Sequence, residues 1–203
     1  KTVNGSLEVT GLEDSKKHTA EVTAPSNEDT YDGTKKSAGT ELTGTTFQWK
    51  DQTYTIEGLT SENVTKTDAG EYENKVNGTA KVLDAAGNDV TDQFKVTKNS
   101  GKLTIKKRTV TLTSATDSKP YDGTALTNDK VTVGGQGFAE GQGATYKVTG
   151  SQTVVGKSAN TFKYTLNEGT KAANYEIKTV NGTLEVTGLE DSKKHTAEVT
   201  APS

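Results

Sequence analysis

The chain repeats its own beginning at its end. Residues 1–26 return as residues 178–203 with one difference, Ser6 against Thr183, so the two copies lie 177 residues apart (178 minus 1). A duplication this long and this nearly identical indicates recent tandem repetition, and we expect the chain to be a window cut from a longer array. Identical units in series usually supply length, spacing or multivalency. The repeat therefore predicts small modular domains.

A weaker similarity divides the repeat in two. The tetrapeptide Tyr-Asp-Gly-Thr at residues 31–34 recurs at residues 121–124. Residues 53–58 resemble residues 145–150, and residues 100–105 resemble residues 181–186. Two divergent domains are therefore expected to alternate. The predicted order is the last strand of a preceding repeat at 1–11, a first β domain at 12–107, a second β domain at 108–187, and the start of the next repeat at 188–203.

The apolar residues alternate with polar residues over short runs, which indicates strands with one buried face. Composition alone would place the chain near disordered proteins, because only 29% of residues are hydrophobic and 6% aromatic. The runs are rich in threonine, valine and aromatic residues and are bounded by glycine, asparagine or aspartate. One helical turn is expected at 169–174. The predicted strands are 18–23, 47–50, 53–57, 71–76, 94–97, 102–105, 109–113, 130–133, 145–149, 161–166, 175–178 and 183–187.

The most specific local motif is Asp68-Ala-Gly70-Glu-Tyr72. It resembles the corner of immunoglobulin-like domains in which a tyrosine hydroxyl bonds back to the backbone at the start of a late strand. Trp49 would then pack in the core, although Asn74 stands where such domains often carry a cysteine. The predicted fold is all-β, with tandem antiparallel β-sandwich domains of immunoglobulin-like type arranged end to end. A β-grasp-like fold with one short helix before Tyr175 is the alternative.

Charge and cysteine content exclude several classes of function. The net charge is −3 with both signs interspersed, so no nucleic-acid footprint is visible. No apolar stretch approaches the roughly 20 residues of a membrane span, so no membrane insertion is expected within this segment. The absence of cysteine excludes disulfides, thiol catalysis and the common structural zinc sites. With no catalytic triad pattern or phosphate loop, the sequence predicts no enzyme and no cofactor.

The two Tyr-Asp-Gly-Thr motifs are interpreted as turns. Glycine accepts positive φ, aspartate bonds its own downstream backbone, and the preceding tyrosine has a ring to bury. Ligand binding is the competing interpretation. The residues predicted to act structurally here are Tyr31, Asp32, Gly33, Tyr121, Asp122 and Gly123.

Three further places could bind something. Asp84, Asn88, Asp89 and Asp92 could offer oxygen ligands to calcium, although their spacing fits no EF-hand loop. The glycine-rich residues 134–143 predict a flexible hairpin loop whose Phe138 is exposed and available to a ligand. His18 and His195 occupy the same repeat position, and a solvent-facing place is expected for both.

The order of motifs resembles that of the YDG and MBG type tandem repeats of large bacterial cell-surface adhesins, especially Gram-positive ones. The resemblance rests on residues 119–127, 150–156, 174–177 and 181–187, with residues 31–34, 68–72, 89–94 and 101–105 similar to a companion repeat. It implies an extracellular, cell-surface or cell-wall location and a structural repeat of a fibre or adhesin stalk. Some relatives also carry intramolecular lysine–asparagine isopeptide bonds.

Two other functions remain open at this point. Each repeat could bind a host glycan or host protein weakly and gain avidity by multiplication. Identical units could also pair laterally into a filament. The neighbouring identical repeats of the same chain are the first expected partners in every case. The junction at 103–112 should be stiff, whereas the polar stretch at 187–196 should leave more freedom.

Overall fold

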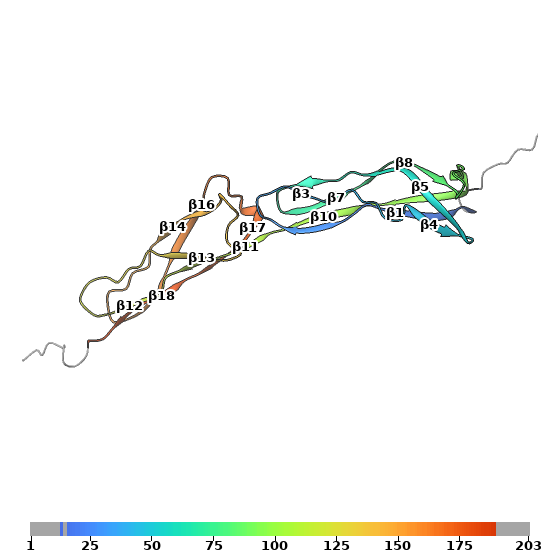
Figure 1. The fold of residues 1–203 in the computed structure, drawn as a ribbon. Coiled ribbons are helices and arrows are strands. Elements are labelled where there is room, and N and C mark those ends of the chain that lie inside the picture. Colours follow the sequence, from blue (N-terminus) through green and yellow to red (C-terminus); the bar gives the residue numbers. More distant parts are fainter. Residues whose placement is uncertain (1–12, 14–15, 190–203) are drawn as a thin grey trace, which may run out of the picture. The chain divides into compact units, whose positions relative to one another are not determined.

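The computed structural model describes residue 13 and residues 16–189, and the chain divides into two compact units between Lys106 and Lys107. Strands dominate both units, and the described residues contain no α-helix, so the fold is all-β (Figure 1). The predicted segment 1–11, and the part of the predicted segment 188–203 beyond residue 189, His195 included, lie outside the described residues. A single residue, Lys107, separates the last strand of the first unit from the first strand of the second.

Within its described residues the first unit contains ten strands, with the 3₁₀ turn η2 directly before β9. Their bounds are β1 His18–Thr23, β2 Asn27–Thr30, β3 Lys36–Ser37, β4 Thr46–Trp49, β5 Gln52–Ser61, β6 Thr65–Lys66, β7 Gly70–Asn74, β8 Val76–Leu83, η2 Thr91–Gln93, β9 Phe94–Asn99 and β10 Gly101–Lys106.

The second unit contains eight strands and one 3₁₀ turn within its described residues. Their bounds are β11 Arg108–Ser114, β12 Asp117–Pro120, β13 Val131–Gly135, β14 Ala144–Val148, β15 Gly156–Asn160, β16 Phe162–Leu166, η3 Ala172–Asn174, β17 Tyr175–Val180 and β18 Gly182–Thr187.

Every predicted strand overlaps an observed one, and the helical turn expected at 169–174 is the 3₁₀ turn η3. The prediction missed all of β8 except its first residue, and it missed five short strands, namely β2, β3, β6, β12 and β15. These have two to five residues, and several are polar on both faces, so no alternation marks them. The predicted strand at 71–76 covers β7 and the first residue of β8. The two strands were joined because the residue composition does not change at Lys75, where β7 and β8 are separated.

The sheets are mixed, so the prediction of purely antiparallel sheets was wrong. Strand β1 pairs in parallel with β9, and β2 pairs in parallel with β10, which pairs on its other side with antiparallel β7. The second unit repeats this, with β11 parallel to β17 and β12 parallel to β18, which pairs with antiparallel β15. Parallel pairing needs long connections, here the whole intervening unit, and local sequence carries no signal of it.

The two units share this scaffold, as the half-period predicts. Besides the parallel pairs, the antiparallel pair β5 and β8 corresponds to β14 and β16. The structure differs from the sequence half-period in one detail. Ser61 pairs with Val76 at the start of β8, and Val148 pairs with Phe162 at the start of β16, so Val148 corresponds to Ser61. The resemblance of residues 53–58 to residues 145–150 is therefore out of structural register.

The core of the first unit lies between β1 and the sheet β4-β5-β8. Val22 and Val82 are fully buried there, and partly buried aromatic rings pack against them. Phe94 contacts Trp49 at 5.3 Å and Tyr54 at 4.8 Å between ring centroids. Trp49 thus packs against the core as expected.

His18 belongs to the same aromatic group. Its ring stacks on Phe47 and Trp49 at 6.0 and 5.7 Å and meets the edge of Phe94 at 6.2 Å. The expected solvent-facing place was therefore wrong for His18. As the first residue of β1 it pairs with Phe94 on β9, which brings its ring to the aromatic group.

Candidate functional site

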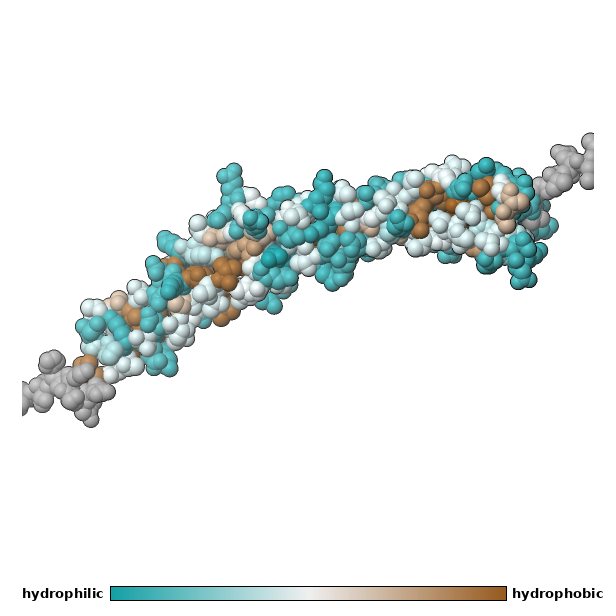
Figure 2. Space-filling view, in the orientation of Figure 1, coloured by the Kyte–Doolittle hydropathy of each residue, from teal (hydrophilic) through white to brown (hydrophobic). Residues whose placement is uncertain are grey.

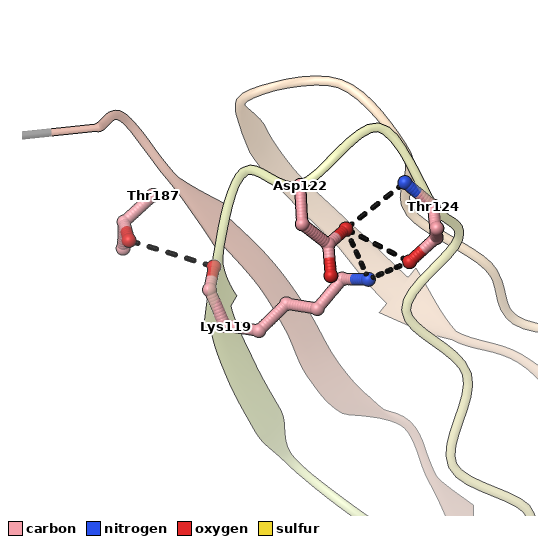
Figure 3. Close-up of polar contacts among 4 residues, drawn as sticks. All are labelled: Lys119, Asp122, Thr124 and Thr187. Carbon is pink, nitrogen blue, oxygen red and sulfur yellow. Dashed lines mark hydrogen bonds and ion pairs between the residues drawn. The ribbon is translucent and has the colours of Figure 1, made fainter. Parts of the chain in front are cut away.

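Both Tyr-Asp-Gly-Thr motifs form tight turns closed by the aspartate. In the first unit, Asp32 Oδ1 accepts hydrogen bonds from the Thr34 amide at 2.8 Å and the Thr34 hydroxyl at 2.6 Å, while Gly33 has φ of 86°. In the second unit, Asp122 accepts the same two bonds from Thr124 at 2.9 and 2.8 Å (Figure 3). The sequence places acceptor and donor two residues apart, so this local geometry follows from it directly.

Each turn is attached to the last strand of its unit. The Tyr31 amide donates to the Lys106 carbonyl at 2.8 Å, and the Tyr121 amide donates to the Thr187 carbonyl at 2.9 Å. In the second unit, the Lys119 amino group binds Asp122 at 2.8 Å and the Thr124 hydroxyl at 2.6 Å (Figure 3). The motifs are therefore used to fix the end of each unit.

The tyrosines of the two motifs differ. Tyr31 is buried, with 3% of its surface exposed, but Tyr121 is 40% exposed. The expectation of a buried ring was therefore wrong for Tyr121. The backbone of both turns is the same, so the difference arises from the residues around the ring, which the motif itself does not specify.

Ion pairing holds the pKa of both turn carboxylates well below the usual aspartate range. For Asp32 the main cause is the Lys36 amino group at 2.5 Å, followed by the Thr34 hydroxyl and amide. For Asp122 the main cause is the Lys119 amino group, followed by the Thr124 amide and hydroxyl. Because the charged form is favoured on folding, each carboxylate contributes stability above its unfolded pKa of about 4, and loses it as the pH falls toward the folded pKa.

Asp122→Asn is therefore expected to reduce the free energy of unfolding of the second unit at pH 7 and to have less effect at pH 2. The asparagine keeps an acceptor for the Thr124 amide but loses the attraction to Lys119. Urea unfolding of the original protein and of the variant, at pH values from 7 to 2, measures the difference between their free energies of unfolding. Asp129→Asn, at an exposed position of the same unit, is the matched control. If the free energies of unfolding of Asp122→Asn and of the original protein differ by the same amount at pH 7 and at pH 2, the lowered pKa of Asp122 is contradicted.

The predicted tyrosine corner has its hydrogen bond. The Tyr72 hydroxyl donates to the Asp68 carbonyl at 3.0 Å, and the Lys66 amino group lies 5.4 Å from the centre of the Tyr72 ring. A methyl group at Gly70 would lie 3.0 Å from the Tyr72 hydroxyl, so glycine makes room for the bond. Residues 68–72 thus close the loop that leads into β7.

A second repeated structure, missed in the sequence, is an asparagine–glycine contact inside each unit. Asn74 ends β7 opposite Gly101 of β10, and Asn160 ends β15 opposite Gly182 of β18. Both asparagines are fully buried. Their amides donate to the Pro25 carbonyl at 2.9 Å and the Ala115 carbonyl at 3.0 Å. The pattern Gly-x-x-x-Asn at residues 70–74 and 156–160 was the signal that could have found it.

The glycines are needed because the same carbonyls approach the last strand. A methyl group at Gly101 would lie 2.1 Å from the Pro25 oxygen, and one at Gly182 would lie 2.3 Å from the Ala115 oxygen. Real side chains do not tolerate such distances. We call these two contacts the Asn–Gly locks. In both locks the asparagine amide donates to a backbone carbonyl of its own unit.

The expected hairpin at the glycine-rich segment 134–143 was wrong, and the segment makes hydrogen bonds within its own unit. It joins β13 to β14, which belong to different sheets. The Arg108 guanidinium donates to the Gly137 carbonyl at 2.8 Å and the Gln136 carbonyl at 2.6 Å. The hydroxyl of the buried Tyr175 accepts from the Ala139 amide at 3.0 Å.

Phe138 is half-buried, and its ring meets that of Tyr175 edge to face at 5.3 Å. The side chain proposed as an exposed ligand contact therefore packs within its own unit. Composition of the segment alone could not show this, because its partner Tyr175 comes from a distant strand.

The acidic loop after β8 satisfies its own oxygens. Asp84 accepts hydrogen bonds from the Ala86 and Asn88 amides at 2.9 and 2.8 Å and from the Asn88 side chain at 2.9 Å. Asp89 accepts from the Thr91 amide and hydroxyl. Asp92 is exposed. In the part of the chain that the structure describes, no three histidine, cysteine or acidic residues are grouped to hold a metal ion.

Two open surface grooves lie at corresponding places in the two units, over the edge strand and the last strand. The first is beside Ser26, Tyr72 and Gly101, and the second is beside Thr116, Lys157 and Thr183. The hydroxyl groups of Ser26 and Thr116 accept from the Lys102 and Thr183 amides at 2.9 and 3.1 Å.

The acidic and basic residues of the two grooves lie on opposite strands. Glu71 on β7 binds Lys102 on β10 at 2.9 Å, whereas Lys157 on β15 binds Glu185 on β18 at 3.2 Å. The position that carries the acid in the first unit thus carries the base in the second. Any ligand common to both grooves must tolerate this exchange.

Comparison with known proteins identifies no relative: no family model, no curated protein and no solved structure matches the chain. Over residue 13 and residues 16–189, no helix has the length and apolar character of a membrane span. The surface visible in Figure 2 is mainly hydrophilic with scattered hydrophobic groups.

Proposed function

We propose that the chain is a structural repeat of a long extracellular surface fibre or adhesin stalk, in which tandem β units supply length and spacing. One observation carries the proposal: a repeat of 177 residues contains the same strand scaffold twice, and its motif residues are engaged in holding that scaffold. Asp32, Tyr72 and Asn74 all bind backbone or neighbouring side chains of their own unit. The connection through Lys107 alone leaves little slack between the units.

We further propose that each unit is a sandwich of immunoglobulin-like type. In such domains the corner tyrosine begins the strand that neighbours the last strand. This relation holds here, because Tyr72 is on β7 and β7 pairs antiparallel with β10. The β-grasp alternative has less support, because only the short turn η3 precedes Tyr175. The resemblance to YDG and MBG repeats supports a cell-surface or cell-wall location.

Small-angle scattering of chains with one and two consecutive repeats tests the fibre. In each unit the last two strands, β9 with β10 and β17 with β18, follow each other with one residue between them. Together they span about 40 Å at roughly 3.3 Å per residue, so two units in series should lengthen the particle by roughly 60 to 80 Å per repeat. A two-repeat chain that is compact would contradict the proposal. Sedimentation over a range of concentrations, run beside it, reports lateral self-association, which a monomer at every concentration would exclude.

The paired grooves favour one second candidate function, a weak glycan-binding or protein-binding site repeated along the array. Two weak sites per repeat would gain avidity from their number. Retention of a multi-repeat chain on a glycan array, weakened by filling the first groove with Ser100→Lys, would support this candidate. No retention on glycans or host proteins would exclude it.

A further inference from the structure

The second unit exposes apolar side chains that the first does not. Among the described residues, the six large hydrophobic side chains with high exposure all belong to the second unit. Val154 and Val155 are the most exposed, at 67% and 57%, and Tyr121 is 40% exposed. The other three are Val133, Tyr164 and Val180.

Tyr121, Val154 and Val155 lie together at one end of the unit, where β18 ends, and we call them the exit face. Pro120, just before Tyr121, pairs with Thr187 of β18. Gly156, just after Val155, pairs with Val186 on the other side of β18. Because neighbouring strands are about 4.8 Å apart, Tyr121 and Val155 flank the end of β18 at roughly 10 Å from each other. Figure 1 shows β12 and β18 side by side at one end of the second unit.

The corresponding positions of the first unit are Tyr31, Asp68 and Ala69. There the ring is buried and the valine pair is replaced by aspartate and alanine. Single exposed valines are ordinary, but grouped apolar side chains mark a surface that another molecule or segment covers. The apolar pair is thus a property of the second unit and not of the shared scaffold.

The repeat identifies the segment that comes after the exit face. Residues 178–203 repeat residues 1–26, which lead into β1 at His18. Beyond Thr187, residues 188–194 precede His195, the copy of His18. The end of the first unit where β1 begins carries the half-buried rings of His18 and Trp49.

We propose that the exit face docks against this aromatic end of the first unit in the next repeat, and so restrains the junction that its polar sequence would leave free. The inference rests on the proposed tandem array. The apolar side chains of one unit then meet aromatic rings of the next, and both leave water. Only seven residues, 188–194, stand between the end of β18 and the copy of His18, so the chain length keeps the two ends within reach of each other.

The test uses a chain of two consecutive repeats. Because the protein has no cysteine, Lys157→Cys in the first repeat and Lys95→Cys in the second provide two unique, exposed sites for spin labels. Electron paramagnetic resonance should give one narrow distance distribution across the junction. Val154→Asp with Val155→Asp in the first repeat should broaden it. The matched control is Val133→Asp with Val180→Asp, at exposed valines of the same unit outside the exit face.

The docking proposal and the fibre proposal would be overturned by different results. A broad distribution that neither pair of substitutions changes would overturn docking and leave the exit face to another partner, while scattering that still shows added length would leave the fibre proposal intact. A compact two-repeat particle would overturn the fibre whatever the labels show. Equal melting of the single-repeat protein with and without the aspartates shows that the second unit remains folded, so broadening then reports the junction alone.

Discussion

Gly101→Ala is expected to unfold the first unit or nearly so, with a loss of about 3 kcal/mol or more. The added methyl group would lie 2.1 Å from the Pro25 carbonyl oxygen and 2.5 Å from the Ala24 oxygen. Overpacking usually costs about 1 to 3 kcal/mol, and this case lies at the upper end because the atoms in the way are backbone and cannot change rotamer. The last strand would have to move away from β2 and from the Asn–Gly lock.

Trp49 is the only tryptophan and lies in the first unit, so its fluorescence follows that unit alone. Gly101→Ala should shift the tryptophan transition in urea to lower concentration. Gly182→Ala, which meets the Ala115 oxygen at 2.3 Å, should leave the tryptophan transition in place and destabilise the second unit as seen by circular dichroism. Gly188→Ala is the matched control, since nothing lies within 4 Å of the added methyl. Equal transitions for Gly101→Ala and Gly188→Ala would contradict the packing.

Asn74→Ala should cost about 3 to 4 kcal/mol and should exceed the cost of Asn160→Ala by about 1 kcal/mol. The Asn74 oxygen accepts from the Val64 amide at 3.1 Å, and its amide donates to Pro25 and to the Ser61 hydroxyl. Removal takes this partner from the half-buried Val64 amide and Pro25 carbonyl, at about 1 to 3 kcal/mol each.

Asn160 makes fewer bonds. Its amide donates to the Ala115 and Asn128 carbonyls at 3.0 and 2.8 Å, whereas its oxygen has no hydrogen-bond partner and faces Gly150. Asn160→Ala therefore removes the hydrogen-bond donor of two carbonyl groups, but it leaves no amide without a partner. Urea unfolding followed by tryptophan fluorescence for the first unit and by circular dichroism for the second measures both changes. A cost for Asn160→Ala equal to or above that for Asn74→Ala would show that the oxygen's bonds contribute little.

The strands could be predicted because their signal is local. In β10, buried Gly101, Leu103 and Ile105 alternate with more exposed neighbours, and that period of two is visible in the sequence. Pairing is different, since β2 and β10 meet across the whole unit and no short window records it. The all-β class was therefore predictable, whereas the parallel pairs were not.

The candidate sites divide in the same way. Asp122 and Thr124 are two residues apart, so their turn could be derived from the motif. Phe138 is half-buried and not exposed as expected, because it packs against Tyr175, which belongs to a distant strand. The exposure of Tyr121 likewise depends on residues outside its motif.

The parallel pairing of early and late strands has a mechanical consequence. If the array bears tension, force enters a unit at its first strand and leaves at its last. Because β1 runs parallel to β9 and β2 runs parallel to β10, such a pull slides each early strand along its late partner and loads their hydrogen bonds together. An antiparallel hairpin pulled from its open ends would instead lose its bonds one after another. The same strand arrangement in the second unit, β12 with β18, gives every unit of the array this resistance to extension.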